Sequence, residues 1–157
     1  MTSKSLSICI LAAGKGTRMN SAIPKVLHEL NNIPLIHHVI KTSQSLNPYK
    51  IISIIGYKKE MVEKSIRDFN IDVAYQNEQN GTAHAVEQCI DKIKIIGGNT
   101  LILSGDVPFI SKETLEKLID LHLKSNSLAS LISAKIKDPT GYGRIVRNNR
   151  NHFNEII

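Results

Sequence analysis

A glycine-containing segment near the amino terminus carries groups suited to phosphate chemistry. Residues 11–19 read Leu-Ala-Ala-Gly-Lys-Gly-Thr-Arg-Met, and Pro24-Lys25 follows shortly after. The two glycines allow successive backbone N–H groups to turn inward as an anion-binding nest. The guanidinium of Arg18 offers a forked donor to a polyphosphate, and Lys25 offers a mobile positive charge. The segment fits neither the G-x-G-x-x-G nor the Walker A pattern, and Gly-Lys-Gly-Thr by itself is more often an ordinary turn.

A second loop, residues 76–85, combines amide, glycine and hydroxyl groups. The Gln76 amide has both a donor and an acceptor, which suits the amide-like edge of a pyrimidine base. Gly81 and Thr82 can present backbone N–H groups beside it. A solvated glutamine and a helix-capping threonine are the alternative, which the loop by itself favours. His84 has no carboxylate partner within sequence reach, so we expect a structural or supporting histidine and not a catalytic one.

A third loop places a carboxylate next to a glycine, in Ser104-Gly105-Asp106. An aspartate at the carboxyl end of a buried strand suits a hard divalent cation beside phosphate groups. Mg²⁺ commonly takes one or two protein carboxylates and fills its other positions with substrate oxygens and water. The loop therefore predicts a Mg²⁺ site at Asp106, with a turn or capping aspartate as the alternative.

Short apolar runs must supply the strands that hold these loops. The first run, residues 7–12, lacks polar alternation, which is typical of a strand buried on both faces of a parallel sheet. We expect strands over residues 7–12, 51–55, 71–75, 100–103 and 128–136. Residues 142–146 and 152–157 are predicted to form a hairpin around residues 148–151.

Helical patterns separate the predicted strands. Helices are expected after Pro34, over residues 61–69 and 82–95, and after Ser111. Pro34 takes the first-turn position that proline favours, and Ser111 is a suitable N-cap. This alternation indicates an α/β fold with a mostly parallel sheet flanked by helices. Ligands bind such sheets beyond the carboxyl ends of the strands, so the loops after Ala12, Tyr75 and Leu103 are expected to converge on one crevice.

Composition narrows the class of partner. The chain has 157 residues, and 20 Lys plus Arg against 14 Asp plus Glu give a net charge of +6. The length fits one domain, and 41% hydrophobic residues exclude wholesale disorder. Aromatic residues make up only 4%, which argues against nucleic acid, and no apolar stretch is long enough for a membrane span. Cys9 and Cys89 form no disulfide framework or metal pattern, so a reducing, cytoplasmic location is expected.

Together the three loops resemble the sugar-1-phosphate nucleotidyltransferases, whose signature is L-x-x-G-x-G-T-R followed by P-K. Within that superfamily the chain is similar to the N-terminal uridyltransferase (pyrophosphorylase) domain of the bacterial bifunctional UDP-N-acetylglucosamine pyrophosphorylase and glucosamine-1-phosphate N-acetyltransferase. Four motifs in the family's order carry the likeness over essentially the whole chain: residues 24–28, residue 76 with 81–85, residues 105–108 and residues 138–145.

The resemblance implies a Rossmann-like nucleotide-diphospho-sugar transferase fold. It also implies transfer of UMP from UTP to N-acetylglucosamine 1-phosphate, giving UDP-N-acetylglucosamine and pyrophosphate for cell-envelope synthesis. Arg18 would meet the triphosphate, Lys25 the reacting phosphates and Asp106 the Mg²⁺ cofactor, while the Gly143 backbone would contact N-acetylglucosamine. The substrate-binding residues that the resemblance implies are Leu11, Ala12, Ala13, Gly14, Lys25, Gln76, Gly81, Thr82, Ser104, Gly105, Asp106 and Gly143.

The family pattern continues past Glu155-Ile156-Ile157, where this sequence stops. A sugar-binding glutamate, two asparagines and a left-handed β-helix acetyltransferase domain come later in the family. We therefore expect residues 1–157 to be an incomplete N-terminal nucleotidyltransferase domain, with the family's oligomerisation residing in the absent domain. The alternatives are a related transferase that uses CTP, GTP or another sugar phosphate, and a non-catalytic nucleotide-binding fragment.

Overall fold

Strands alternate with helices along the first of two compact units, residues 1–120 and 121–157. The computed structural model describes residues 6–16, 19–94, 98–125, 127–150 and 152–157. The first unit contains β1 (Leu6–Ala12), η3 (Lys25–Leu27), β2 (Glu29–Leu30), β3 (Ile33–Pro34), α1 (Leu35–Ser45), β4 (Lys50–Ile55), α2 (Lys59–Ile66), η4 (Arg67–Phe69), β5 (Asp72–Tyr75), α3 (Thr82–Glu87), α4 (Ile90–Lys94), β6 (Asn99–Ser104) and most of α5 (Lys112–Ser125). The second unit contains the end of α5, β7 (Ile145–Arg147) and β8 (Phe153–Ile156).

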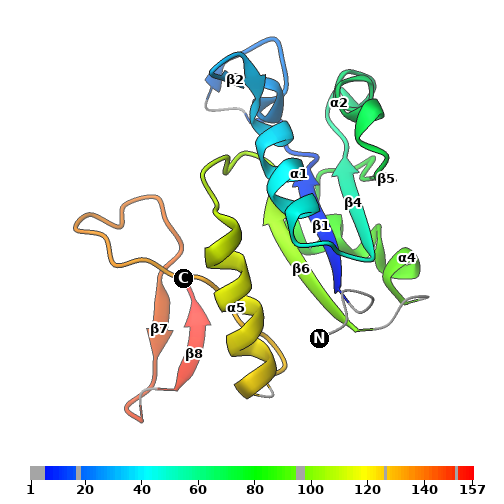
Figure 1. Ribbon diagram of the computed structural model, residues 1–157. Helices are drawn as coiled ribbons and strands as arrows, with labels where there is room; N and C mark the ends of the chain where they lie inside the picture. The colour runs from blue at the N-terminus through cyan, green and yellow to red at the C-terminus, as the bar shows by residue number, and fades with distance from the viewer. Residues whose placement is uncertain (1–5, 17–18, 95–97, 126, 151) are drawn as a thin grey trace. The chain divides into compact units, whose positions relative to one another are not determined.

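The central sheet has the strand order β5-β4-β1-β6, and each neighbouring pair is parallel. β1 lies inside the sheet and pairs with β4 from Ser7 to Ala12 and with β6 from Leu6 to Leu11 (Figure 1). The chain moves outward from β1 through β4 to β5 and then returns to the other side of β1 for β6. Loops on the two sides of such a reversal open a crevice. The predicted α/β fold with a parallel sheet is confirmed.

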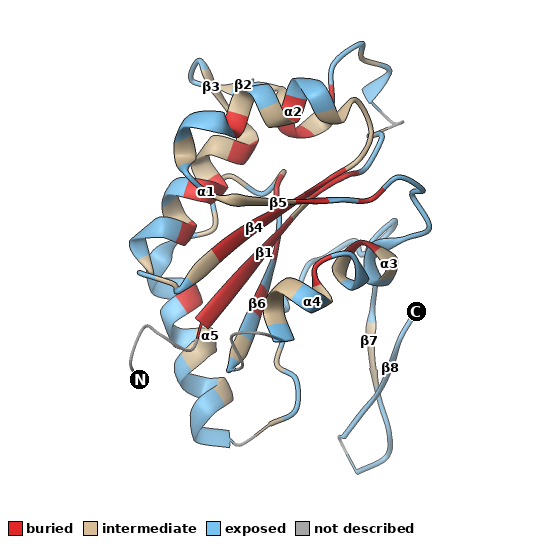
Figure 2. Ribbon diagram, turned by 90° about the vertical axis from the view of Figure 1, so that its right-hand side faces the viewer, coloured by how far each residue is buried: buried red, intermediate tan, exposed pale blue. Residues whose placement is uncertain are grey.

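Side chains of β1 alternate between two apolar clusters, one on each face of the sheet. Leu6, Ile8, Ile10 and Ala12 join buried residues of α1, α2 and α5. Cys9 joins residues of β4, β5 and α3. Figure 2 shows the corresponding layers, with α1 and α2 on one side of the sheet and α3 and α4 on the other. Because both faces are covered, β1 reads in the sequence as a continuous apolar run.

The two cysteines meet inside the second cluster. Cys9 and Cys89 are both fully buried free thiols, and their Sγ atoms lie 3.3 Å apart. Burial, followed by the hydrogen bond with Cys89, raises the pKa of the Cys9 thiol well above its ordinary range. Since the thiolate is the reactive form of cysteine, Cys9 is a packing residue with little nucleophilic character.

Truncating a side chain between the sheet and α3 should destabilise the fold strongly. Ile54 of β4 is fully buried, whereas Ile102 of β6 is 47% exposed. Ile54→Ala is expected to lower the free energy of unfolding by about 2–5 kcal/mol, because it leaves a cavity in the core. Ile102→Ala, the same change on the same sheet, should cost less than about 1.5 kcal/mol. Urea unfolding measures both, and equal losses would contradict this assignment of the core.

The helices form near their predicted positions, but their bounds differ. The segment predicted as one helix over residues 61–69 contains α2, which ends at Ile66, and then the 3-10 helix η4. The predicted helix over residues 82–95 is split into α3 and α4, because the N–H groups of Gln88 and Cys89 donate to carbonyls three residues earlier, at 3.2 and 3.0 Å. This tighter turn ends α3 and buries Cys89; Ile95 lies outside the described residues. Ser111 caps α5 as predicted, through its Oγ and the Thr114 N–H. Within the described ranges, no helix combines the length and apolar character needed to cross a bilayer.

A small hairpin precedes α1 and alters the expected role of Pro34. Asn31 and Asn32 have φ values of 53° and 60°, and they join β2 to β3. Two adjacent positive φ values are the requirement of a type I′ turn, which asparagine tolerates well. Pro34 pairs with Glu29 at the end of β3 and has a ψ of 140°, so it is the N-cap of α1 and not its first residue. The Asn-Asn pair is the sequence signal for this hairpin.

In the second unit the predicted hairpin forms, but the predicted strand over residues 128–136 does not. β7 and β8 pair antiparallel around residues 148–152. Residues 129–136 have no regular structure, and Leu128, Leu131 and Ile132 are exposed. An apolar run becomes a strand only where another strand accepts its backbone hydrogen bonds. In this unit the two described strands, β7 and β8, form their backbone hydrogen bonds with each other. Residues 128–136 therefore have no described strand of this unit to pair with.

Candidate active site

Three loops converge at the carboxyl edge of the sheet, where the strand arrows end in Figure 1. They follow β1, β5 and β6, and together they border a cavity of about 460 Å³, a size typical of ligand sites. The cavity is lined by Leu11, Ala12, Ala13, Gly14, Gly16, Met19, Lys25, Val26, Gln76, Gln79, Gly81, Thr82, Ala85, Ser104 and Asp106. The structure thus brings together ten of the predicted substrate-binding residues.

Two predicted site residues of the first unit are not among those that line the cavity. Gly105 is buried, and its N–H donates to the Leu11 carbonyl at 2.9 Å, which joins the third loop to β1. Arg18, predicted at the triphosphate, lies outside the described residues together with Thr17.

The first loop is held against Lys25 by a glycine. Gly16 has a φ of +60°, and a Cβ at this position would lie 2.8 Å from the Lys25 Cβ. The Met19 N–H donates to the Gly16 carbonyl at 3.0 Å, which closes the turn. Gly14, by contrast, has no positive φ. Of the two glycines that the sequence offered for an anion nest, only Gly16 has the left-handed backbone conformation.

Opposite charges face each other across the cavity mouth. The Lys25 Nζ lies 2.6 Å from Asp106 Oδ2, and the two side chains are 43% and 27% exposed. Lys25 is the first residue of η3, and Asp106 follows β6 directly, so the fold itself sets this separation. An incoming phosphate can compete for the lysine because the pair remains accessible to solvent.

Asp106 by itself offers a divalent cation only part of a coordination shell. In the portion of the chain that the structure describes, no group of three or more His, Cys, Asp or Glu side chains is placed to hold a metal ion. Mg²⁺ commonly accepts a single protein carboxylate when phosphate oxygens and water complete its shell. The donor set therefore fits a cation that arrives with a polyphosphate, and it does not fit a permanently bound one.

The second loop buries an amide at the cavity wall. Gln76 is 3% exposed, and its Nε2 lies 3.0 Å from the Gly81 carbonyl and 3.1 Å from His84 Nδ1. Its backbone N–H donates to the Ile55 carbonyl at 2.8 Å, which continues the ladder beyond β5. The interpretation of Gln76 as a solvated loop residue, which the loop alone favoured, is therefore wrong.

Two residues that shape this wall, Gln79 and Gly56, had no role at this site predicted from the sequence. Gln79 lines the cavity, and its Nε2 donates to the Gln76 carbonyl at 3.1 Å. Gly56 ends β4 where a Cβ would come within 2.5 Å of the same carbonyl, so only glycine lets the loop lie there. The signal for Gln79 was a second amide three residues after Gln76. Nothing in the sequence linked Gly56 to this loop.

Gly81→Ala should destabilise the fold. Gly81 has a φ of 95° and a ψ of 178°, a region that is essentially restricted to glycine. Open space surrounds its missing Cβ, so the cost is conformational, about 1–3 kcal/mol of unfolding free energy. Gly14→Ala also meets open space but has no positive φ, and should change stability by less than about 0.5 kcal/mol. Equal urea midpoints for the two variants would refute this account.

Gly143 belongs to the second unit, where it lies beside the β7–β8 hairpin. A Cβ on Gly143 would lie 3.0 Å from Ile156 Cγ2. Nearby, the Thr140 hydroxyl and N–H both donate to Asp138 Oδ1, at 2.6 and 3.0 Å. These two bonds lower the pKa of the Asp138 carboxyl below its ordinary range. The fourth sequence motif therefore begins with a hydrogen-bonded turn.

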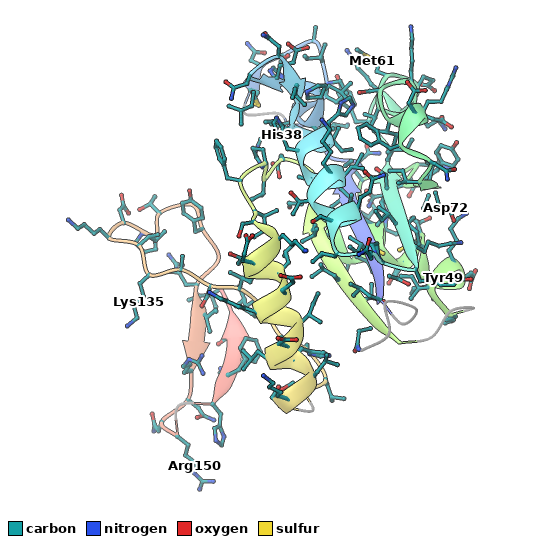
Figure 3. All side chains as sticks on the ribbon, in the orientation of Figure 1. His38, Tyr49, Met61, Asp72, Lys135 and Arg150 are labelled. Carbon is teal, nitrogen blue, oxygen red and sulfur yellow. The ribbon has the colours of Figure 1, made fainter. Side chains whose placement is uncertain are left out.

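A second hollow of about 400 Å³ lies at the amino-terminal ends of β4 and β5. Tyr49 and Asp72 border it (Figure 3), and Asp72 pairs with Lys50 at 2.8 Å. Since ligands of open α/β sheets bind at the opposite, carboxyl edge, we assign this hollow no catalytic role. The Lys50–Asp72 pair resembles the Lys25–Asp106 pair in distance and exposure, so its variants can serve as controls for variants of Lys25 and Asp106.

Comparison with known proteins shows the family of this chain. Residues 8–150 match the MobA-like NTP transferase domain family. The curated relatives include the bifunctional protein GlmU of a Synechococcus species, 38% identical over 157 residues, and that of Streptococcus uberis, 41% identical over 148 residues. These alignments cover 100% and 94% of this chain but 25% and 31% of the relatives, so the chain spans less than a third of their length. The resemblance stated from the sequence motifs is confirmed.

Solved structures share the fold at lower identity. HddC from Yersinia pseudotuberculosis, complexed with GMP-PN, has a TM-score of 0.72 at 22% identity, covering 96% of this chain and 68% of that one. A 4-diphosphocytidyl-2C-methyl-D-erythritol synthase from Anaerococcus prevotii has a TM-score of 0.66 at 17% identity, covering 99% and 65%. Rv0371c from Mycobacterium tuberculosis, in complex with manganese, has a TM-score of 0.63 at 18% identity, covering 74% and 59%. The nucleotidyltransferase fold is confirmed.

Proposed function

Because this chain belongs to the MobA-like NTP transferase domain family, we propose that it takes part in the transfer of UMP from UTP to N-acetylglucosamine 1-phosphate. In this reaction an oxygen of the sugar phosphate forms a bond to the α-phosphorus of UTP. The bond from that phosphorus to the pyrophosphate oxygen breaks, and the products are UDP-N-acetylglucosamine and pyrophosphate. No protein nucleophile is needed, so the task of the site is positioning and charge stabilisation.

One observation carries the proposal: loops from three separate strands place a buried amide, a glycine turn and a lysine–aspartate pair around one cavity. The amide of Gln76 suits a pyrimidine base, and Lys25 suits phosphate oxygens. The first loop lines the same cavity, and its Gly16 lies close to Lys25. A nucleoside triphosphate needs all three elements in this order.

Within this proposal each group has a distinct task. Gln76 and the backbone at Gly81 hold the uracil, and residues 11–14 hold the rest of the uridine. Lys25 stabilises the negative charge that develops on the reacting phosphates. Arg18 is proposed to bind the triphosphate, on the sequence motif alone. Gly143 is proposed to contact the sugar, as the resemblance implies.

Asp106 is proposed to hold Mg²⁺ together with the phosphates of the nucleotide. Such a cation, when bound, neutralises phosphate charge and polarises the bond that breaks. The manganese complex of Rv0371c supports a divalent cation in a protein of the same fold. The Asp106 carboxylate pairs with the Lys25 ammonium, so Asp106 would hold the cation and Lys25 would bind phosphate oxygens from the same side of the cavity.

We propose that the product serves cell-envelope synthesis, as the resemblance to the uridyltransferase family implies. The GlmU proteins are named as bifunctional, and this chain matches less than a third of their length. We propose that residues 1–157 contribute the nucleotide-binding part of the uridyltransferase reaction, and that the acetyl-transfer reaction and self-association belong to other parts of such proteins. A cytoplasmic location, where UTP is available, follows from this proposal.

A nucleotide panel tests the proposal. Calorimetric titrations with UTP, CTP, GTP and ATP in the presence of Mg²⁺ should give the lowest Kd for UTP, and pyrophosphate release should require N-acetylglucosamine 1-phosphate. Preference for CTP or GTP would overturn the uridine assignment and favour a related transferase. UTP binding with no pyrophosphate release, in an assay in which a GlmU protein is active, would favour a nucleotide-binding role without catalysis.

A further inference from the structure

Both amide hydrogens of the Gln76 side chain are engaged within the protein. Its Nε2 lies 3.0 Å from the Gly81 carbonyl oxygen and 3.1 Å from the Nδ1 atom of His84. All three residues border or support the same cavity wall, and Gln76 is almost fully buried. A primary amide has two N–H donors and one carbonyl acceptor. With the two donors used, Oε1 is the atom that the amide can offer to a ligand.

The chemistry of the partners fixes the direction of this amide. A backbone carbonyl can only accept, so the amide atom that faces Gly81 must be nitrogen. The second N–H then points at His84 Nδ1, which must supply a lone pair. That requirement selects the neutral imidazole with its proton on Nε2. Turning the amide over would set Oε1 against the Gly81 oxygen and against this lone pair.

We propose that His84 is a positioning residue that makes the site select uracil over cytosine by holding the Gln76 amide with Oε1 toward the base. The inference rests on the proposed function, because it assumes that a pyrimidine nucleotide occupies this cavity. It goes further by naming the residue that sets the choice between the two pyrimidines. His84 does so without contact with the base itself, through its bond to Gln76.

The two bases differ at the atom that this amide would meet. Uracil carries a hydrogen on N3, which Oε1 can accept, whereas cytosine has a lone pair on N3. Cytosine at the same place would set two acceptors against each other unless the amide turned over. Turning it over breaks the bonds to Gly81 and His84 together, and a hydrogen bond of this kind contributes about 0.5–1.5 kcal/mol. Discrimination therefore depends on how firmly these two partners hold the amide.

Three variants separate the positioning role from a merely structural one. His84→Leu keeps a side chain of similar bulk but removes the acceptor, and should reduce the ratio of CTP Kd to UTP Kd by about 3- to 10-fold. His84→Asn keeps an acceptor, because its Oδ1 is attached to Cγ as Nδ1 is in histidine, and should restore most of the ratio. His38→Leu is the matched control, since His38 lies on α1, away from the cavity (Figure 3), and its Nε2 is bonded to the Leu30 carbonyl of β2.

Calorimetric titration of each variant with UTP and CTP gives the ratio, and a ¹⁵N–¹H correlation spectrum of the ligand-free protein reports the protonated nitrogen of His84. Protonation of Nε2 alone, with a ratio that falls in His84→Leu and recovers in His84→Asn, supports the inference. An unchanged ratio in a folded His84→Leu, or a proton on Nδ1, overturns it while leaving the proposed function intact. If the unsubstituted chain does not prefer UTP to CTP, the proposed function and this inference both fail.

Discussion

Replacing Lys25 by methionine is expected to slow pyrophosphate release from UTP on the order of 10²- to 10³-fold, the loss typical of removing one preorganised charge-stabilising group. Its effect on folding should be small. The Lys25–Asp106 pair is partly exposed, and ion pairs in such positions contribute about 0.2–1 kcal/mol. Methionine keeps the apolar stem that lies beside the Gly16 turn. The variant therefore separates catalysis from stability.

Lys50→Met is the matched control for this substitution. Lys50 also pairs with an aspartate, Asp72, at 2.8 Å and with similar exposure, but at the opposite edge of the sheet. Both variants should show nearly the same urea midpoint, and only Lys25→Met should lose turnover. The Kd for UTP should also rise by about 10- to 100-fold in Lys25→Met alone, because a hydrogen bond to a charged group is lost. Unchanged turnover and UTP affinity in a folded Lys25→Met would remove Lys25 from the proposed mechanism.

The four strands of the central sheet and the meeting of the three loops could be predicted from sequence because both depend on simple rules. Strands covered on both faces, such as β1, read as apolar runs, and the carboxyl ends of parallel strands share one edge. The positions of Gln76 and Asp106 at the cavity follow from those two rules. These predictions needed no knowledge of side-chain contacts.

The remaining features depend on contacts between residues far apart in sequence. Gly56 is required because the Gln76 carbonyl passes close to it, and Cys89, just after α3, packs against Cys9 of β1. Lys25 and Asp106, which form an ion pair, are 106 − 25 = 81 positions apart in the sequence. Local propensity contains none of this information.

For residues 128–136 the sequence predicted a strand that the structure does not contain. Their sequence has the β-branched and aliphatic residues of a strand, but the described strands of their unit, β7 and β8, pair with each other. β-propensity reflects how well a side chain fits a sheet that already exists. A run of this kind is therefore weaker evidence for a strand than the parallel runs of β1 and β4, which support each other.

Asp106→Asn is the second substitution with a large expected effect, and it distinguishes two roles of the carboxylate. If Asp106 served only as a partner for Lys25 or as a turn residue, asparagine would preserve the shape and most of the rate. If it binds a divalent cation, loss of the negative charge should lower turnover on the order of 10²-fold or more. The affinity for Mn²⁺ in the presence of UTP should fall in parallel.

The control for Asp106→Asn is Asp72→Asn, which breaks the comparable pair with Lys50. Titration of Mn²⁺ followed by electron paramagnetic resonance, with and without UTP, measures cation affinity directly. Without nucleotide, all three proteins should bind Mn²⁺ weakly, because even an intact Asp106 is a single carboxylate paired with Lys25. With UTP, binding should tighten in the unsubstituted chain and in Asp72→Asn, but not in Asp106→Asn. Tight Mn²⁺ binding in Asp106→Asn would show that the cation is held elsewhere, and Asp106 would then act on the reaction only through Lys25.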